Sequence, residues 1–317
     1  MRSFLSCFGP CLTEYVALRQ KLGFQFQTQA EMLIQFDRYA HARNHSGPIT
    51  AELITSFATA DSISDVRQVR RYQVVRNFTD YLAIHEPATP LMDPGFIRRP
   101  ARRRLAHIYS DAEMMSLLDA AKKVSRLRPM RGASLHAMVG LAAATGLRIS
   151  EVIRLDRRDV DLRTGALSVL RTKFAKDRLV PVHASTLEIL RGYAERRDAH
   201  FGALECPAFF INLCGRRYSR HTLELDFWRL GRATGLREAK GKGPRFHDLR
   251  HSYAVKRLAE WYREGIDVQA MLPVLATYMG HVNYTTTAYY LSATAELLGL
   301  AAERFVAFAG ATKEVAP

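Results

Sequence analysis

The sequence predicts a mainly α-helical protein with a small antiparallel β-sheet, divided into two domains. Apolar residues recur at the helical period along most of the chain, and only one stretch alternates as strands do. The chain has 317 residues, of which 48% are hydrophobic. That length exceeds the roughly 250 residues at which single hydrophobic cores stop growing. A segment rich in proline and arginine near residue 100 separates the two helical parts.

Residues 1–97 predict a small domain of four or five helices. Two stretches place their apolar side chains on one helix face, and arginines surround the second of them. We therefore expect two of the helices to pack against each other along these faces. The apolar residues of the two stretches are Met32, Leu33, Phe36, Tyr39 and Ala40, and Val74, Val75, Phe78, Tyr81 and Leu82.

Residues 98–107 predict an extended, arginine-rich linker. Prolines 90, 94 and 100 lack backbone donors and disfavour helix in the residue before each. Arginines in such a segment suit a strap across a DNA phosphate backbone, and a solvated charge run is the alternative. The arginines are Arg98, Arg99, Arg102, Arg103 and Arg104.

Residues 108–317 predict the second domain, which contains the sheet. Ser110 and Glu113 form a capping box that starts a helix ending near Val124. Residues 136–145 predict an almost wholly buried helix. Strands at 166–170 and 179–182 flank the polar turn RTKFAKD and predict a hairpin. Further helices are predicted at 185–200, 219–234, 247–263, 268–279 and 285–308, the last broken near 292–294.

The charge of the chain is positive and unevenly distributed. The net charge is +15; residues 1–100 carry 11 basic and 9 acidic side chains, and residues 101–317 carry 35 and 22. This excess favours a polyanionic partner, most simply nucleic acid, with an anionic membrane surface as the alternative. The longest uncharged run, residues 132–147, is too short to span a bilayer. Four cysteines are too few for a disulfide scaffold, so we expect a soluble intracellular protein.

Two motifs of the second domain carry candidate phosphate ligands. Arg148 and Glu151 lie three residues apart at a predicted helix start, just after Gly146. A helix N-terminus with a neighbouring arginine suits a phosphate, and an ordinary surface ion pair is the alternative. Lys173 and Lys176 lie in the hairpin turn, from which a lysine can reach a DNA groove and donate a proton. Exposed turns also carry lysine for no such reason.

The motif HDLRHSYA places His247, Arg250 and His251 on one helix. His247 shares a face with Arg250 and with His251, because three- and four-residue spacings are neighbours on a helix. The His-x-x-x-His spacing resembles part of a zinc motif. However, Asp248 stands where that motif needs glutamate, Arg250 would put a positive charge beside the metal, and no third ligand is evident. The sequence therefore predicts no metal site and no cofactor.

The order and spacing of these motifs resemble those of the tyrosine recombinases, the phage-integrase and Xer-type family. The resemblance covers most of residues 105–300 and is densest in TGLRISE, KDRLVPV, HDLRHSYA and MGH…TTTAYY. It implies a two-domain DNA clamp, in which a helical core-binding domain (1–97) is joined by the linker (98–107) to a catalytic domain (108–317). The matching residues, in chain order, are Arg148, Lys173, His247, Arg250, His281 and Tyr290.

The resemblance also implies the reaction, which is cleavage and rejoining of duplex DNA. Tyr290 attacks a phosphodiester and forms a 3′-phosphotyrosine that conserves the bond energy, so neither ATP nor a metal ion is required. His247 accepts or positions the proton of Tyr290. Arg148, Arg250 and His281 stabilise the charge that develops on the phosphoryl oxygens.

The remaining site residues are also carried over from the family pattern. Lys173 protonates the leaving 5′-oxygen, and Lys176 in the same turn contacts DNA and is the alternative general acid. Glu151 supports the arginine and histidine side chains as a neighbouring carboxylate. Tyr289 is the alternative nucleophile, but the interval of nine residues after the histidine of Gly-His selects Tyr290.

The implied partner is double-stranded DNA with paired recombination sites, bound by a homotetramer or by a hetero-tetramer with related recombinases. In such an assembly the tail helix after Tyr290 docks on a neighbouring protomer, and packing on its own domain is the alternative. We expect a cytoplasmic, nucleoid-associated protein with no membrane partner. The apolar stripe of the tail comprises Leu297, Leu298, Leu300, Ala301, Phe305 and Phe308.

The biological role is less determined than the chemistry. The tail sequence favours a recombinase or integrase of a mobile element, and resolution of chromosome or plasmid dimers by the same chemistry is the alternative. A type IB topoisomerase-like enzyme would relax supercoils without paired sites. A DNA-binding regulator without catalysis would bind DNA without nicking it.

Overall fold

The chain divides into two compact units, Met1–Arg104 and Leu105–Pro317, each with its own hydrophobic core. The division falls inside the segment predicted as a linker. The predicted strap residues Arg98, Arg99, Arg102, Arg103 and Arg104 lie outside the described residues. The computed structural model describes residues 4–61, 63–97, 105–127, 129–170, 177–238, 243–281, 285–292 and 294–311.

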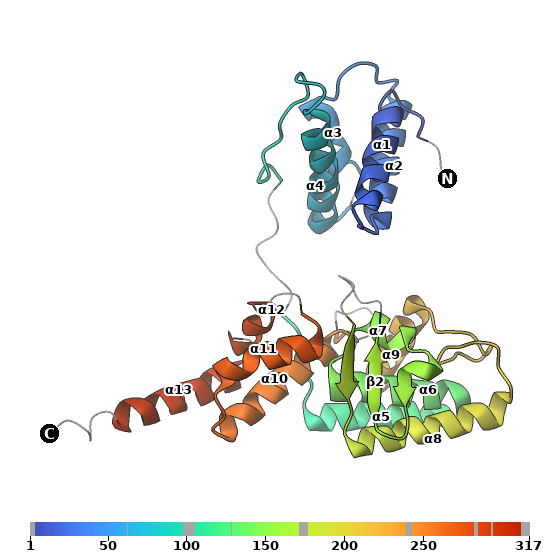
Figure 1. The fold of residues 1–317 in the computed structure, drawn as a ribbon, viewed down its shortest axis with the longest axis vertical. Helices are drawn as coiled ribbons and strands as arrows, with labels where there is room; N and C mark the ends of the chain where they lie inside the picture. The colour runs from blue at the N-terminus through green and yellow to red at the C-terminus, as the bar shows by residue number, and fades with distance from the viewer. Residues whose placement is uncertain are drawn as a thin grey trace. The chain divides into compact units, whose positions relative to one another are not determined.

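The described part of the first unit contains four helices that pack side by side (Figure 1). As the periodicity predicts, α2 and α4 turn apolar faces inward, with Leu33, Phe36, Val75 and Phe78 buried. Aromatic rings fill much of this core, and Phe36 meets Phe57 edge-on with ring centroids 5.3 Å apart. The helices are α1 (Gly9–Lys21), α2 (Gln27–Ala42), α3 (Ala51–Thr59) and α4 (Asp65–Leu82).

A buried carboxylate holds the start of the chain on this bundle. Asp37 of α2 is fully buried. It accepts hydrogen bonds from the backbone N of Leu5 (2.6 Å), the backbone N of Ser6 (3.0 Å) and Ser6 Oγ (2.5 Å). A buried carboxylate needs such donors to offset its lost hydration. Asp37 therefore joins residues far apart in sequence within the first unit.

The second unit is helical around one small sheet. Among the described residues three strands form an antiparallel sheet in the order β1-β2-β3, with Val169 opposite Arg178. The strands are β1 (Val160–Asp161), β2 (Ala166–Val169) and β3 (Arg178–Pro181). The helices are α5 (Asp111–Leu127), α6 (Pro129–Thr145), α7 (Ile149–Arg154), α8 (Ala184–Phe201), α9 (Arg220–Ala233), α10 (Asp248–Arg263), α11 (Val268–Met279), α12 (Thr285–Ala288) and α13 (Ala295–Ala311), with short 3₁₀ turns η1 (Arg157–Asp159) and η2 (Tyr289–Ser292).

Helix α6 lies at the centre of the second unit. It packs against α5, α8 and α10, and its side chains are buried around most of its circumference. A helix that is apolar on all sides is stable only when other elements surround it. This position explains why the uncharged run from residue 132 to 147 is a core helix. No described helix is long and apolar enough to cross a membrane.

The predicted elements of the second unit match the structure in kind, with two corrections. The central helix begins at Pro129, seven residues earlier than predicted, because proline is well suited to the first helical position. The sheet gains β1, which at two residues is too short for any periodicity to reveal. The capping box is confirmed, since Glu113 N donates to Ser110 Oγ at 3.1 Å and Ser110 N to Glu113 Oε2 at 2.8 Å. The tail helix is broken at η2, close to the predicted position.

We predict that Asp37→Ala lowers the stability of the first unit by about 1–3 kcal/mol, the typical cost of leaving buried donors without an acceptor. Urea unfolding followed by circular dichroism measures this change. Asp80→Ala is the control, because its pair with Arg76 is partly exposed at 3.6 Å and such pairs contribute about 0–1 kcal/mol. Equal effects of the two substitutions would contradict the role given to Asp37.

Candidate active site

Three arginine side chains converge on the C-terminal end of α11. The last carbonyl groups of a helix lack partners within the helix and carry its partial negative charge, so they attract cations. Arg148, Arg178 and Arg250, which we call the arginine cluster, come from the start of α7, from β3 and from α10. Each donates to a different carbonyl oxygen: Arg178 Nε to Tyr278 (2.8 Å), Arg250 Nη2 to Met279 (2.7 Å) and Arg148 Nη2 to Gly280 (3.0 Å).

Glu151 is the counter-charge of two members of the cluster. It accepts hydrogen bonds from Arg148 through the backbone N (2.9 Å) and Nη1 (2.8 Å). It also accepts from Arg178 through Nη1 (3.2 Å) and Nη2 (3.0 Å). Because the side chain of Glu151 is only 6% exposed, the pair is not an ordinary surface ion pair.

The surroundings of Glu151 keep it ionised. Burial acts to raise the pKa of Glu151, but the hydrogen bonds and charges of Arg178 and Arg148 outweigh burial and hold this pKa below its usual value. Glu151 therefore stays a carboxylate at neutral pH. In that form it accepts four hydrogen bonds and fixes the guanidinium groups of both arginines.

Arg250 is the most deeply buried member of the arginine cluster, at 2% exposure. Its Nη1 donates to the carbonyl oxygen of Gly146 at 2.7 Å, which ties α10 to the turn before α7. Burial, followed by the charge of Arg148, lowers the pKa of Arg250 to about 10, so it remains a cation at neutral pH. Gly146 has φ +63°, and a Cβ there would lie 2.7 Å from Tyr253 Cδ1, so this turn requires glycine.

A second glycine makes room for the cluster. Gly280 ends α11 in the left-handed conformation, with φ +67°. A Cβ at Gly280 would lie 2.6 Å from Arg178 Nη1. The guanidinium of Arg178 can therefore cross the end of α11 only because residue 280 has no side chain.

His281 follows directly and is held in place on both sides. Its backbone N donates to the carbonyl oxygen of Ala276 at 2.8 Å. A hydrogen bond of 2.7 Å joins its ring Nδ1 to Thr287 Oγ1 of α12. Burial, followed by the positive charges of Arg250, Arg148 and Arg178, lowers the pKa of His281 to about 3. The imidazole is therefore neutral at neutral pH while no anion occupies the site.

Tyr290 lies beside this histidine. It belongs to η2, and its side chain is 3% exposed. Its ring stacks with the ring of His281 at a centroid distance of 6.3 Å and an interplanar angle of 23°. The ring of His251 meets Tyr290 edge-on at 5.4 Å. The fold thus brings the predicted nucleophile next to the end of α11 and to the arginine cluster.

A further ring contact leads from Tyr290 back to His247. The rings of His247 and His251 are 4.9 Å apart and nearly perpendicular. The side chain of His247 is exposed, yet desolvation of its ring, followed by the charges of His251 and Arg250, lowers its pKa to about 4. Burial also lowers the pKa of His251, whose Nδ1 has no hydrogen-bond partner among the described residues. Both imidazoles are therefore neutral at neutral pH.

The structure brings together the predicted residues Arg148, Glu151, Arg250, His281 and Tyr290, and ring contacts connect His247 to them. The predicted turn residues Lys173 and Lys176 lie outside the described residues. Sequence reasoning missed two members of the site, Arg178 and His251. The spacing of four residues between His247 and His251 was a usable signal for the second. Arg178 lies within KDRLVPV, one of the segments in which the family resemblance is densest, but that resemblance gave it no role.

The site consists of a cationic cluster, neutral imidazoles and a buried tyrosine. Fixed guanidinium groups bind an anion and stabilise charge that develops on it. A neutral imidazole can accept a proton, and an anion bound nearby would raise its pKa. Within the described parts of the chain, no three His, Cys, Asp or Glu side chains are grouped to hold a metal ion.

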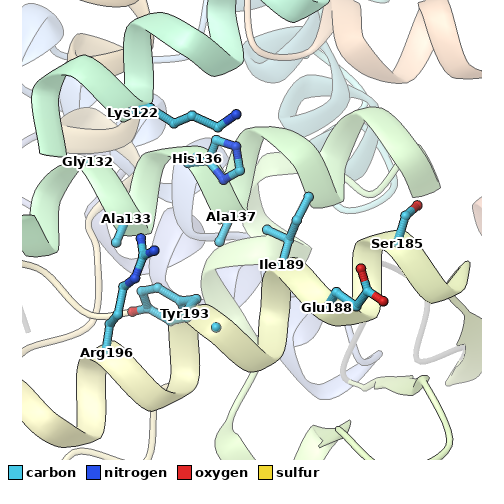
Figure 2. Close-up of a pocket in the computed structure, with 11 residues that line it drawn as sticks. Lys122, Gly132, Ala133, His136, Ala137, Ser185, Glu188, Ile189, Tyr193 and Arg196 are labelled. Atoms are coloured by element: carbon cyan, nitrogen blue, oxygen red, sulfur yellow. The ribbon is translucent and has the colours of Figure 1, made fainter.

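A separate cavity of about 640 Å³ lies between α6 and α8, with Lys122 of α5 at its edge (Figure 2). Its lining includes His136, Ser185, Glu188 and Arg196, and none of the predicted site residues lines it. Burial, followed by the charges of Lys122 and Arg196, lowers the pKa of His136. The described catalytic candidates therefore lie elsewhere, at the start of α7, along the first turn of α10, just after α11 and in η2.

Comparison with known sequences identifies relatives over most of the chain. The model of the phage integrase family matches residues 109–296. The integrase/recombinase y4rE of Sinorhizobium fredii is 41% identical, covering 96% of this chain and 97% of the relative. The tyrosine recombinase XerD of Mycobacterium leprae is 29% identical, covering 77% of this chain and 72% of the relative.

Solved structures share the fold. The Tn1549 transposon integrase, solved in complex with transposon right-end DNA, has a TM-score of 0.68 at 16% identity and covers 94% of this chain and 98% of its own. The XerH site-specific recombinase, solved on a palindromic difH substrate, has a TM-score of 0.64 at 20% identity and covers 92% of this chain and 83% of its own. The matched family model and the relative at 41% identity show that this chain belongs to the phage integrase family of tyrosine recombinases, which are DNA breaking-and-rejoining enzymes.

Proposed function

We propose that the protein is a site-specific recombinase that cleaves and rejoins duplex DNA through a 3′-phosphotyrosine on Tyr290. One observation carries this proposal: Tyr290 stacks on His281, which directly follows the helix end that gathers the arginine cluster. A tyrosine beside fixed cations can attack a phosphodiester whose negative charge those cations hold.

The phosphate would bind between the arginine cluster and His281. Arg148 is the accessible member, with 29% of its side chain exposed. Arg250 contributes its positive charge from a buried position, and the ring of His281 donates a hydrogen bond to the phosphate. As Tyr290 attacks, charge grows on the phosphoryl oxygens, and these donors hold them in fixed geometry.

Cleavage moves two protons, one away from the tyrosine and one onto the leaving oxygen. The Oη of Tyr290 forms a bond to phosphorus while the bond from phosphorus to the 5′-oxygen breaks. The tyrosine proton passes to a neutral imidazole, for which His247 is our assignment, with His251 in ring contact with both His247 and Tyr290. Lys173 of the hairpin turn protonates the leaving 5′-oxygen, with Lys176 as the alternative. Rejoining reverses these transfers, so the reaction uses neither ATP nor a metal ion.

The two domains would enclose DNA as a clamp. The helical domain of residues 1–97 and the catalytic domain of residues 108–317 bind the duplex, and the linker of residues 98–107 crosses the backbone between them. Arginine suits this task because its planar fork binds phosphate through two hydrogen bonds. The supporting observation is the excess of basic residues after residue 100.

Assembly would use the tail helix α13. Its beginning packs within its own unit, where Leu297 is buried and Arg304 donates to the carbonyl oxygen of Gly265 at 3.0 Å. Farther along, Phe305 and Val306 are 70% and 68% exposed. A lambda integrase tetramer has been solved on a Holliday junction. By analogy we propose a homotetramer, or a hetero-tetramer with related recombinases, on paired DNA sites.

We propose that the protein is the recombinase of a mobile element. It would act on DNA in the cytoplasm, in association with the nucleoid. The relative at 41% identity is named an integrase/recombinase, whereas the XerD relative is at 29% identity. Excision assays on the DNA that flanks the coding sequence test this assignment, with dimer resolution as the competing outcome. A circular excision product supports the mobile-element role, and conversion of dimers without excision contradicts it.

We predict that Tyr290→Phe abolishes an SDS-resistant protein–DNA adduct while DNA affinity is unchanged, because only the attacking oxygen is removed. Nicked candidate sites trap the covalent product for gel analysis. Tyr289→Phe is the matched control and should retain the adduct. The assignment is wrong if the adduct survives Tyr290→Phe and is lost in Tyr289→Phe.

A truncated chain that ends before Ala295, and so lacks α13, should assemble less well on paired sites, with a smaller loss of binding to one site. Leu298→Ser with Phe305→Ser tests the same surface without removing the buried Leu297, because both side chains are exposed. Gel-shift titrations on one-site and two-site DNA give both affinities. Equal losses for the two DNAs would show that α13 does not contribute to assembly.

DNA affinity should fall steeply with salt, with a log–log slope of about 0.9 for each phosphate neutralised. Replacing the five linker arginines by glutamine should therefore reduce the magnitude of the slope by up to about 4.5. Lys176→Gln should reduce it by about 0.9. Fluorescence anisotropy over a salt series measures these slopes, and an unchanged slope would exclude the linker as a DNA strap.

A further inference from the structure

We propose that Arg178 is a positioning residue for DNA cleavage, acting on Arg148 through Glu151, which it joins to the end of α11. This inference rests on the proposed function, because it concerns how the phosphate site is held. Arg178 lies in β3 and is separated in sequence by 27 residues from Glu151 and by 100 residues from Tyr278. One guanidinium therefore joins three segments that together build the site.

The side chain of Arg178 is buried and engaged in hydrogen bonds between β3, α7 and α11. Its side chain is only 8% exposed, and it makes a two-pronged bond to Glu151 and a third bond to the Tyr278 carbonyl oxygen. Gly280 leaves the space through which the guanidinium passes. A planar fork can satisfy this arrangement, whereas the ammonium of lysine cannot contact all three acceptors in the same way.

A buried ion pair of this kind often adds little to the free energy of unfolding. Apolar residues of similar volume are often equally stable at such positions, whereas removal of one partner leaves a charge buried without compensation. Arg178 lies on the same face of β3 as the fully buried Val180, where an apolar side chain would suit the strand equally well. The bonds of Arg178 instead set the distance between Glu151 and the helix end, to both of which Arg148 is bonded.

The charge of Glu151 connects this geometry to pH. Arg148 and Arg178 bond to Glu151 directly, and Arg250 and His281 also interact with its charge. Without Arg178, burial would favour the neutral acid and the pKa of Glu151 would rise. A protonated Glu151 loses acceptor capacity for Arg148. Arg148 would then be released as the pH falls, over a pH range in which the wild type keeps it bound.

The test measures the rate of Tyr290-dependent adduct formation between pH 5.5 and 8.5 on a nicked DNA site. We expect adduct formation by Arg178→Gln to be about 100-fold slower near neutral pH, because a displacement of a reacting group by about 1 Å can cause a loss of that size. The acid limb of its pH profile should move to higher pH, and DNA affinity should change much less than the rate.

Arg131→Gln is the matched control. Arg131 forms a two-pronged pair with the buried Asp226 between α6 and α9, away from the arginine cluster. Its loss should lower the melting temperature, as loss of Arg178 should, and leave the shape of the pH profile unchanged. An equal shift of the acid limb in both variants would show that general destabilisation, and not Arg178, sets the profile.

A double-mutant cycle with Glu151→Gln identifies the route of the effect. If Arg178 acts through Glu151, Arg178→Gln should slow the Glu151→Gln enzyme by less than about 5-fold, because residues that act as a unit are not additive. A full 100-fold further loss would overturn the proposal. So would a pH profile of Arg178→Gln that coincides with the wild type.

If Arg178→Gln does not fold, Arg178→Lys is measured in its place. It keeps the charge near Glu151 but not the fork, so we expect a loss of about 10-fold and a smaller shift of the acid limb in the same direction. Wild-type rate and profile in this variant would overturn the proposal. Failure of the proposed function is distinguishable, because the wild type would then form no Tyr290-dependent adduct at all.

Discussion

The site depends on the unsatisfied carbonyl groups at the C-terminal end of α11. These groups attract positive charge, and the arginine cluster of Arg148, Arg178 and Arg250 supplies it from α7, β3 and α10. Three like charges repel each other unless a counter-charge lies among them, and Glu151 provides it from a buried position. The same helix end places His281 beside the cluster.

Several other features follow from this arrangement. Gly146 and Gly280 adopt left-handed conformations where a side chain would strike Tyr253 or Arg178. His281 has a pKa lowered to about 3 because burial, followed by the charges of the cluster, disfavours its charged form. In the proposed reaction, the cationic residues bind a phosphate while neutral imidazoles can accept a proton. Fixed donors of this kind need no reorganisation when charge develops on a phosphoryl group.

Much of the fold and part of the site could be predicted from sequence. The apolar periodicity located the helices, and the box of Ser110 and Glu113 located the start of α5 to within a residue. The short strand β1 and the true start of α6 at Pro129 escaped, because neither leaves a periodic signal. Family spacing singled out Arg148, Arg250 and Tyr290, but not Arg178 or His251, whose contacts lie far away in the chain or depend on ring packing.

The sequence by itself determined the elements and the chemical groups, since local spacing controls helix formation and residue type controls charge and reactivity. Only the tertiary structure decided how these groups contact one another and that Arg178 is among them. Glu151 and Arg178 are 27 residues apart, and Arg148 and Gly280 are 132 apart, yet each pair is hydrogen-bonded. Such contacts arise when packing brings distant segments together, and the burial and neighbouring charges that accompany packing set the pKa values of Glu151 and His281. No pattern along the chain contains that information.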